Sequence, residues 1–145
     1  MYQMCGVHET PVGDAVYGEG GSAVVSAAGF GTVVKVFRNG RVCSREVDVL
    51  RLVGDHPRLP TLVSYGVDRI VMTDCGMCCL LDWLTQTPAP EEAACDAAAA
   101  DVASALAHMH SLRVAHCDVK ADNVVVGVDG RASLIDFNLA HVYRE

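Results

Sequence analysis

The sequence predicts an α+β fold in which an antiparallel β region is followed by a mainly helical region. Short apolar runs with strand-like alternation, separated by turns that contain glycine, fill residues 18–73. An alanine-rich run at 91–111 has the length and composition of one long helix, and an apolar hairpin follows at 124–135. We therefore expect a sheet that carries one helix, and then helices that lead into a hairpin.

The composition limits the functions that this chain can have. Its 145 residues fit one modest domain or part of one, and 51% of them are hydrophobic, which is ample for a core. A formal net charge of −7 argues against nucleic acid or an anionic membrane as the main partner. The sequence has no apolar run of transmembrane length and no signal-peptide pattern. We expect an intracellular location, in the cytoplasm or the nucleus.

Seven cysteines are spread along the chain without a disulfide framework, and such an odd set is typical of reduced thiols. Cys75 and Cys78 have the C-x-x-C spacing of zinc and redox sites. A structural zinc site needs a second pair of ligands, which the sequence does not offer. Partly buried free thiols are the alternative that we favour.

A glycine-rich segment opens the β region, after residues 1–16, which have little periodicity and are interpreted as an N-terminal extension. Residues 18–25 fit the pattern G-x-G-x-x-G-x-V, with Ala23 in the place of the third glycine. Such a segment can close a strand–turn–strand over phosphate groups, with backbone N–H groups pointing inward. Any glycine-rich hairpin matches the pattern, so its weight comes from its position before a strand that carries a lysine.

That strand is predicted at 32–37, where Lys35 shares a face with apolar neighbours. A lone lysine can reach water with its long side chain, so Lys35 alone indicates little. A helix is predicted at 44–53, ended by Gly54, and Glu46 lies on its apolar stripe. A carboxylate at such a position needs a buried cation, and we expect Lys35 to supply it.

The middle of the chain is predicted to continue the sheet and then to become helical. Strands are expected at 62–66 and 69–72, and a short helix at 78–86 precedes a proline-rich turn. The helix at 91–111 begins after a proline, with negative charges in its first turn. We place Asp101 on its polar stripe; most other side chains are apolar, so this helix must pack on more than one side.

The hairpin at 124–135 turns at an Asp-Gly pair, which tolerates the positive φ of tight turns. The loop before it carries Asp118, Lys120 and Asn123, and Asp136 directly follows it. A hairpin brings these two ends together. The oxygen atoms of Asn123 and Asp136 suit Mg²⁺. A free carboxylate on Asp118 can orient a hydroxyl, and Lys120 can neutralise a phosphate, so the set suits phosphoryl transfer.

Two runs of residues resemble the catalytic loop and the metal-binding motif of protein kinases: His-Cys-Asp-Val-Lys-Ala-Asp-Asn at 116–123 and Asp-Phe-Asn at 136–138. A lysine two residues after the loop aspartate resembles the serine/threonine-specific branch. The match runs in order from residue 18 to about residue 142. It implies a protein-kinase-like fold, with an N-lobe at 17–74 and the first helices and catalytic-loop hairpin of a C-lobe at 75–145.

The resemblance also implies the roles of the four polar residues around the hairpin. Asp118 and Lys120 would be catalytic, the first by orienting the substrate hydroxyl and the second by stabilising the transferred phosphoryl group. Asn123 and Asp136 would be the metal ligands. The implied cofactors are ATP and Mg²⁺, and the implied partner is a protein substrate or a partner kinase.

The same resemblance places the nucleotide in the first lobe. Lys35, held by Glu46, would position the α- and β-phosphates, and Met72 would guard the back of the adenine pocket. The remaining cofactor-binding positions are Gly18, Gly20, Gly21, Ala23 and Val25 in the glycine-rich segment, and Asp74 and Cys75 in the hinge, whose backbone would hydrogen-bond the adenine.

Three departures from the family pattern modify these expectations. Cys117 replaces an arginine that in many kinases grips a phosphorylated activation segment, so activation by phosphorylation is not expected. Asn138 replaces the glycine of the metal motif and is expected at positive φ, which Asn tolerates next best. The match ends before the family's activation segment and large helices. We therefore expect a C-terminally truncated domain that associates, with itself or another protein, through an uncovered side of the helix at 91–111.

Three functions remain open at this point. The first is a serine/threonine protein kinase, a transferase that moves a phosphoryl group from ATP to a protein hydroxyl. The alternative is a non-catalytic kinase mimic that binds a kinase or its substrate. A small-molecule phosphotransferase with the same core is a third option. Compact viral kinases, which act in the host cell, tolerate departures such as those above.

Overall fold

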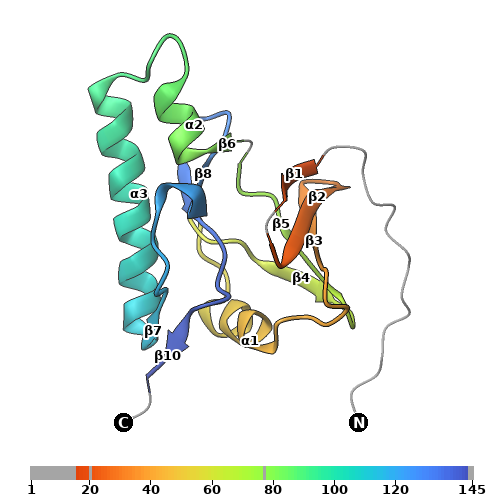
Figure 1. The fold of residues 1–145 in the computed structure, drawn as a ribbon. Coiled ribbons are helices and arrows are strands. Elements are labelled where there is room, and N and C mark those ends of the chain that lie inside the picture. Colours follow the sequence, from red (N-terminus) through yellow and green to blue (C-terminus); the bar gives the residue numbers. More distant parts are fainter. Residues whose placement is uncertain (1–15, 20, 77, 144–145) are drawn as a thin grey trace.

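The computed structural model describes residues 16–19, 21–76 and 78–143, which form two lobes (Figure 1). The first lobe contains an antiparallel sheet, as the alternating apolar runs predicted, and its five described strands lie in the order β1-β2-β3-β5-β4. Its strands are β1 (Val16–Glu19), β2 (Ala23–Gly29), β3 (Thr32–Phe37), β4 (Leu62–Tyr65) and β5 (Arg69–Thr73). Gly20 and nearly all of the predicted N-terminal extension lie outside the described residues.

Helix α1 (Ser44–Val53) connects β3 to β4, with the bounds that its apolar stripe predicted. Gly54 ends it at a φ of 58°, where its N–H donates to the carbonyl of Leu50 at 3.3 Å. The buried face of α1 includes Glu46, which is only 1% exposed. The helix therefore carries one carboxylate into the protein interior.

The second lobe follows residue 77 and contains two helices and three short hydrogen-bonded strand pairs (Figure 1). Its elements are β6 (Cys78–Cys79), α2 (Leu80–Thr85), α3 (Glu92–Ser111), β7 (Val114–Ala115), the 3-10 turn η1 (Ala121–Asn123), β8 (Val124–Val126), β9 (Ala132–Leu134) and β10 (His141–Val142). Strand β8 pairs with β9 as predicted, and Gly130 takes the positive φ of the turn between them, 74°. The hairpin brings residues 118–123 and 136 to one end.

The start of the second lobe corrects one prediction. A helix was expected at 78–86, but Cys78 and Cys79 form β6, which pairs with β8. Their backbone groups are used in that ladder, so α2 begins only at Leu80. The Cys79 sulfur then accepts the N–H of Asp82 at 3.5 Å and caps the new helix.

Gly76 lies between the lobes, where its backbone passes close to β8. A methyl group added at this position would lie 2.8 Å from the Val126 carbonyl carbon and 2.9 Å from its oxygen. These are main-chain atoms of a paired strand, so they cannot move aside easily. Beyond the presence of a glycine, nothing in the sequence indicates this close approach.

We expect Gly76→Ala to lower the free energy of unfolding by about 1–3 kcal/mol, the usual cost of overpacking. Urea denaturation would measure the change. Gly66→Ala is the matched control, because the added methyl group would meet only the Arg69 Cγ at an ordinary 3.6 Å. Equal stability of the two variants would show that the approach of Gly76 to Val126 is not tight.

Helix α3 buries a charged residue of its predicted polar stripe, Asp101. Asp101 is 5% exposed and accepts hydrogen bonds from the Arg131 guanidinium and from the Ala132 N–H, the latter at 3.0 Å. The Arg58 Nε lies 3.6 Å from the same carboxylate. The interior position is possible because these neighbours compensate the charge.

No helix in the described part of the chain is both long and apolar enough to cross a membrane.

We expect Asp101→Ala to lower the free energy of unfolding by about 2–3 kcal/mol, since a buried N–H and two guanidinium groups lose their acceptor. The Arg131 hydrogen bonds hold the pKa of Asp101 below its usual value. This carboxylate therefore stabilises the fold above its unfolded pKa of about 3.9, and the contribution is lost as the pH falls through the lower folded value. The difference in the free energy of unfolding between Asp101→Ala and the wild type should therefore shrink in acid. A loss no larger than that of Asp96→Ala, an exposed carboxylate on α3, would contradict this account.

Candidate functional site

The loop before β8 is held in place by a buried histidine. His116 is 1% exposed, accepts the Asp118 N–H on Nδ1 at 3.2 Å and faces the Ile135 carbonyl with Nε2 at 2.9 Å. One neutral tautomer, with its proton on Nε2, satisfies both bonds. The ring also packs edge-on against Phe137, with centroids 5.5 Å apart. His116 thus ties the loop to the far end of the hairpin.

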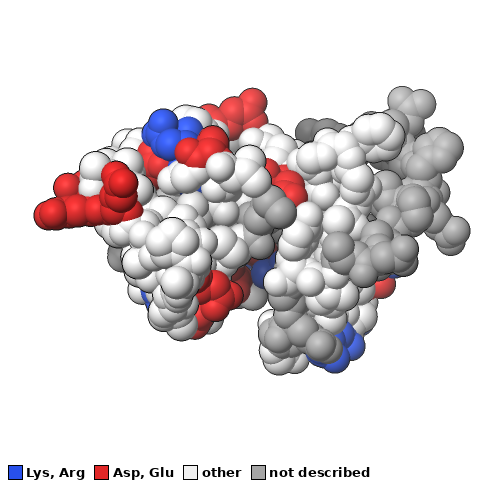
Figure 2. Space-filling view, turned by 90° about the horizontal axis from the view of Figure 1, so that it is seen from above, with Lys and Arg blue, Asp and Glu red and all other residues white. Residues whose placement is uncertain are grey.

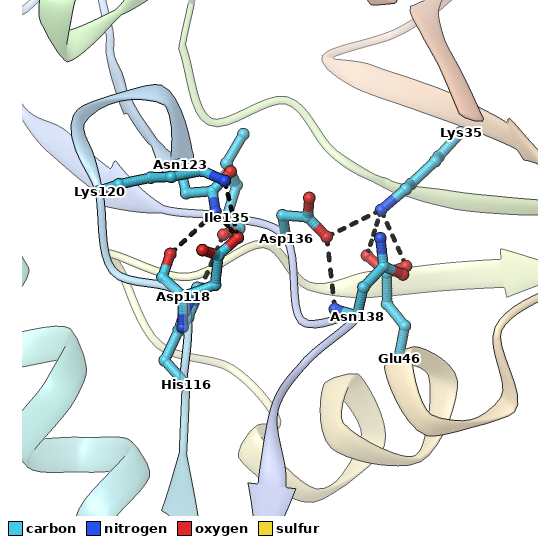
Figure 3. A network of polar contacts seen from close by, with 9 residues as sticks. All are labelled: Lys35, Glu46, His116, Asp118, Lys120, Asn123, Ile135, Asp136 and Asn138. Carbon is cyan, nitrogen blue, oxygen red and sulfur yellow. Dashed lines mark hydrogen bonds and ion pairs between the residues drawn. The ribbon is translucent and has the colours of Figure 1, made fainter. Parts of the chain in front are cut away.

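Asp118 lies at the centre of a polar cluster in this loop (Figure 3). The Asn123 amide donates to its carbonyl at 2.9 Å and to its carboxylate at 2.8 Å, and the Lys120 ammonium lies 3.0 Å from the same carboxylate. The hydrogen bond from Lys120, followed by that from Asn123, holds the pKa of Asp118 below its usual value. Both Asn123 bonds use the amide nitrogen, so its oxygen Oδ1 takes no part in them.

A second cluster joins three elements of the chain. The Lys35 ammonium of β3 lies 2.9 Å from both oxygens of Glu46 on α1, which confirms the expected pair. It also lies 3.1 Å from Asp136 Oδ1, a contact that the sequence had not indicated. Burial raises the pKa of Glu46, and the Lys35 ammonium opposes that shift. The cluster fixes the lysine between the first lobe and the end of the hairpin (Figure 3).

The turn after β9 corrects the expectation for Asn138. The residue at positive φ is Asp136, at 66°, and Asn138 is not among the residues that adopt such an angle. The Asn138 N–H instead donates to Asp136 Oδ1 at 3.3 Å. A main-chain group therefore holds the carboxylate, and this bond is compatible with any residue except proline at position 138.

The positions predicted to bind the nucleotide lie along the sheet and in the segment between the lobes. Gly18 of β1 is opposite Val25 of β2, Val25 is opposite Lys35, and Gly21 lies in the exposed turn between β1 and β2. Ala23 and Met72 are buried in the core, 5% and 7% exposed. The surface is hollowed between the two lobes, and charged side chains of both signs show within the hollow (Figure 2).

The side chains of the segment between the lobes form hydrogen bonds within the protein. Asp74 accepts the Gly76 N–H on its carboxylate at 3.1 Å, and its own N–H donates to Gly31 at 2.8 Å. The Cys75 thiol lies 3.8 Å from the Thr73 carbonyl, and burial raises its pKa to about 11. Such a thiol is unreactive.

All cysteines of the described part are free, and no group of three or more His, Cys, Asp or Glu residues there could hold a metal ion.

A model of the protein kinase domain matches residues 17–145 of this chain. The chain belongs to the protein kinase family. Sperm motility kinase 3A of Mus musculus is 29% identical over 152 residues, which cover 96% of this chain and 30% of that protein. Serine/threonine-protein kinase 36 of Pongo abelii is 32% identical over 103 residues, covering 69% of this chain and 8% of the relative. Serine/threonine-protein kinase AGC1-7 of Arabidopsis thaliana is 37% identical over 92 residues, or 59% and 17% of the two chains. The chain thus spans 30% or less of these relatives' lengths.

The candidate site has a donor set that fits Mg²⁺. Asn123 offers a carbonyl oxygen that its hydrogen bonds to Asp118 leave unused. Asp136 uses Oδ1 for Lys35 and Asn138, and its side chain is 33% exposed. Mg²⁺ prefers one or two protein oxygens and completes its shell with phosphate oxygens and water. The two oxygen donors, one of them on the partly exposed side chain of Asp136, match that preference.

The contacts missed in the sequence are mostly main-chain contacts. The Ile135 carbonyl anchors His116, and the Asn138 N–H holds Asp136. Every residue except proline has both of these groups, so they leave no trace in the sequence. The Lys35–Asp136 contact could have been inferred from the kinase resemblance only by placing the two motifs in space.

Proposed function

We propose that this chain binds ATP with Mg²⁺ and transfers the γ-phosphoryl group to a serine or threonine hydroxyl of a protein. The observation that carries the proposal is the meeting of two polar clusters at one end of the β8–β9 hairpin (Figure 3). One contains Asp118, Lys120 and Asn123, and the other contains Lys35 and Asp136. Family membership supports the same reaction.

The first cluster supplies the groups that act on the acceptor. Asp118 is ionised at neutral pH, as a carboxyl group of ordinary pKa already is, and hydrogen bonds from Lys120 and Asn123 lower its pKa further. Its carboxylate accepts the hydrogen bond of the substrate hydroxyl and thereby points the oxygen at the γ-phosphorus. As the new P–O bond forms and the bond to ADP breaks, the hydroxyl proton passes to Asp118 or to the phosphoryl group. Lys120 neutralises charge on the moving phosphoryl group.

The second cluster supplies the groups that hold the nucleotide. Lys35 would donate to the α- and β-phosphates, and Glu46 holds the ammonium in position from the buried side. Asn123 Oδ1 and the Asp136 carboxylate would bind Mg²⁺, which neutralises phosphate charge when it is present. The glycine-rich turn between β1 and β2 would cover the phosphates with its backbone N–H groups.

We expect Mg²⁺-dependent ATP affinity to depend on Asp136 more than on Asp118. Asp136 would hold Mg²⁺, which would neutralise charge on the phosphates, whereas Asp118 would act on the incoming hydroxyl. Calorimetric titration of ATP, with and without Mg²⁺, into wild type, Asp136→Ala and Asp118→Ala measures this. We expect Asp136→Ala to lose about tenfold or more of the Mg²⁺-dependent affinity, from one lost charge-assisted contact, and Asp118→Ala to stay near wild type.

The outcome also separates the two main functions. Equal, Mg²⁺-independent affinity in the three proteins would mean that no metal site forms, and the non-catalytic mimic would then be the better description. Mg²⁺-dependent binding without transfer to any hydroxyl would support a protein that keeps the nucleotide site and acts through its partners. Transfer to a serine- or threonine-containing protein supports the proposed kinase.

A further inference from the structure

The end of helix α1 is tied to the second lobe by several polar contacts. The carbonyl of Val53, the last residue of α1, lies 2.8 Å from His108 Nε2 on α3. The Arg58 carbonyl accepts the Leu134 N–H of β9 at 3.0 Å, and Arg58 Nε lies 3.6 Å from Asp101. Residues 53–58 therefore join the helix that carries Glu46 to the body of the second lobe.

Two stacked histidines form the centre of this junction. The rings of His56 and His108 lie 4.6 Å apart, with 21° between their planes. His56 Nδ1 accepts the Arg58 N–H at 3.2 Å, and its Nε2 lies 3.5 Å from the Ser104 hydroxyl of α3. The first bond requires Nδ1 without a proton, so the contacts describe a neutral His56.

A proton on His56 would disturb both its hydrogen bond with Arg58 and its stack with His108. Nδ1 would become a donor facing another donor, the Arg58 N–H, and that bond would be lost. A positive charge would also arise 4.6 Å from the His108 ring and close to the Arg58 guanidinium. A shift of His108 away from that charge would leave the Val53 carbonyl at the end of α1 without its donor.

The groups that shift the pKa of His56 all oppose such a charge. Burial, then His108 and then Arg58 hold the pKa of His56 below its ordinary value, and all three act in the same direction. Asp101 on α3 is engaged by Arg131 and Arg58. The other charged side chains on this side are Asp55, exposed in the same loop, and Asp74, Asp129 and Arg131, which line a polar cavity of about 380 Å³ with His56.

We propose that the His56–His108 stack is a proton-sensitive clasp that holds the end of helix α1 on α3 while His56 is neutral and loosens it when His56 is protonated. His56 and His108 are then positioning residues for Glu46, because they act through the helix that carries it. The further consequence, weaker Mg²⁺-dependent ATP binding in acid, rests on the proposed function. The clasp itself does not.

The direction of the pH effect follows from linkage. A histidine whose folded pKa is lowered binds its proton more readily in the unfolded chain. Its destabilising effect is absent well above the unfolded pKa of about 6.5 and grows as the pH falls below that value. It reaches its full size once the pH is below the folded pKa. Acid should therefore favour opening of the clasp.

The test compares unfolding by urea from about pH 7.5 to about pH 5 in wild type and His56→Asn. Asparagine Oδ1 can accept the Arg58 N–H as Nδ1 does, and it does not titrate. Below about pH 6.5, we expect the unfolding constant of the wild type to rise faster than that of His56→Asn, by up to about tenfold for each pH unit. Both proteins contain the same carboxylates, so the difference isolates the histidine.

His108→Gln is the second variant, because its amide can still donate to the Val53 carbonyl while the ring stack is gone. We expect it to fold at neutral pH and to show a smaller pH dependence than the wild type. NMR of the wild type should show the amide signals of Glu46 and Val53 shifting with the same midpoint as the His56 ring. Parallel pH curves for wild type and His56→Asn would overturn the clasp, as would Glu46 and Val53 signals that ignore the His56 titration. Absence of ATP binding would overturn only the proposed function.

Discussion

Replacement of Asp118 by asparagine is expected to reduce phosphoryl transfer to a serine- or threonine-containing protein by about 10²–10⁴-fold, the usual contribution of a positioned acid or base. Asparagine keeps the shape of the side chain but loses the charge that Lys120 and Asn123 stabilise. The hydroxyl would lose its acceptor, whereas the nucleotide would keep its phosphate contacts. Transfer of radiolabelled γ-phosphate in single-turnover experiments, together with ATP affinity, measures both effects.

The loop supplies a matched control for this variant. Asp122 lies in the same segment, is exposed and is not assigned a role in the reaction. Asp122→Asn should therefore leave transfer within about twofold of wild type, as expected for a surface substitution. Equal losses in Asp118→Asn and Asp122→Asn would show that the loop responds to charge in general. Unchanged transfer in Asp118→Asn would remove this residue from the mechanism.

Loss of either partner of the buried Lys35–Glu46 pair is expected to lower the free energy of unfolding by about 3 kcal/mol, within the range for a broken buried ion pair. Lys35 and Glu46 are 6% and 1% exposed, so a single substitution leaves the other group short of water. In Glu46→Leu, Lys35 retains the Asp136 contact at 3.1 Å. In Lys35→Met, Glu46 has no other buried cation that the structure shows near it, so Lys35→Met should cost more.

The double variant Lys35→Met/Glu46→Leu separates stability from binding. Two apolar residues of similar volume can replace a buried pair at little cost, so the double variant should be more stable than the sum of the single effects predicts. It should still lack Mg²⁺-dependent binding of ATP, because the Lys35 ammonium is gone. Urea denaturation and calorimetry give the two readouts, and Asp48→Leu on the exposed side of α1 is the control. Additive losses of stability would show that the two groups do not interact as the distances indicate.

The sequence predicted the parts of the fold that depend on local periodicity. The strands of the first lobe, helix α1 and the β8–β9 hairpin follow from alternating or stripe-like apolar patterns and from Gly54 and Gly130 at their ends. The Lys35–Glu46 pair was predictable for a different reason. Each charge lies on an apolar face of its own element, and two such faces need a common partner.

Other features depend on neighbours that are distant in the sequence. Asp101 has the position of a solvent-facing residue on an isolated helix, and its contacts with Arg131, Arg58 and the Ala132 N–H make it an interior one. The strand at Cys78–Cys79 exists because β8 pairs with it. A strand of two residues is too short to show a recognisable periodicity in the sequence. The positive φ likewise lies at Asp136 rather than at Asn138, and the Asp136 carboxylate contacts Lys35 and the Asn138 N–H.

The association that we expect through an uncovered side of helix α3 stays a prediction. Its larger apolar side chains are covered at least in part, with Met109 fully buried and Val102 and Leu106 half-buried. The exposed positions of α3 are occupied mainly by alanines, such as Ala97 and Ala103. Light scattering over a dilution series tests whether this surface causes association.

The central claim is that the two ends of the β8–β9 hairpin build one metal–nucleotide site. Mn²⁺, which replaces Mg²⁺ at oxygen sites, broadens the NMR signals of nearby nuclei, so its position can be read residue by residue. With ATP present, we expect the side-chain amide of Asn123 and the backbone amide of Asp136 to broaden at low Mn²⁺ concentration. Signals from the first turn of α3, at the top of the view in Figure 1, should stay sharp. Broadening that spares Asn123 and Asp136, or that is the same without ATP, would contradict the account.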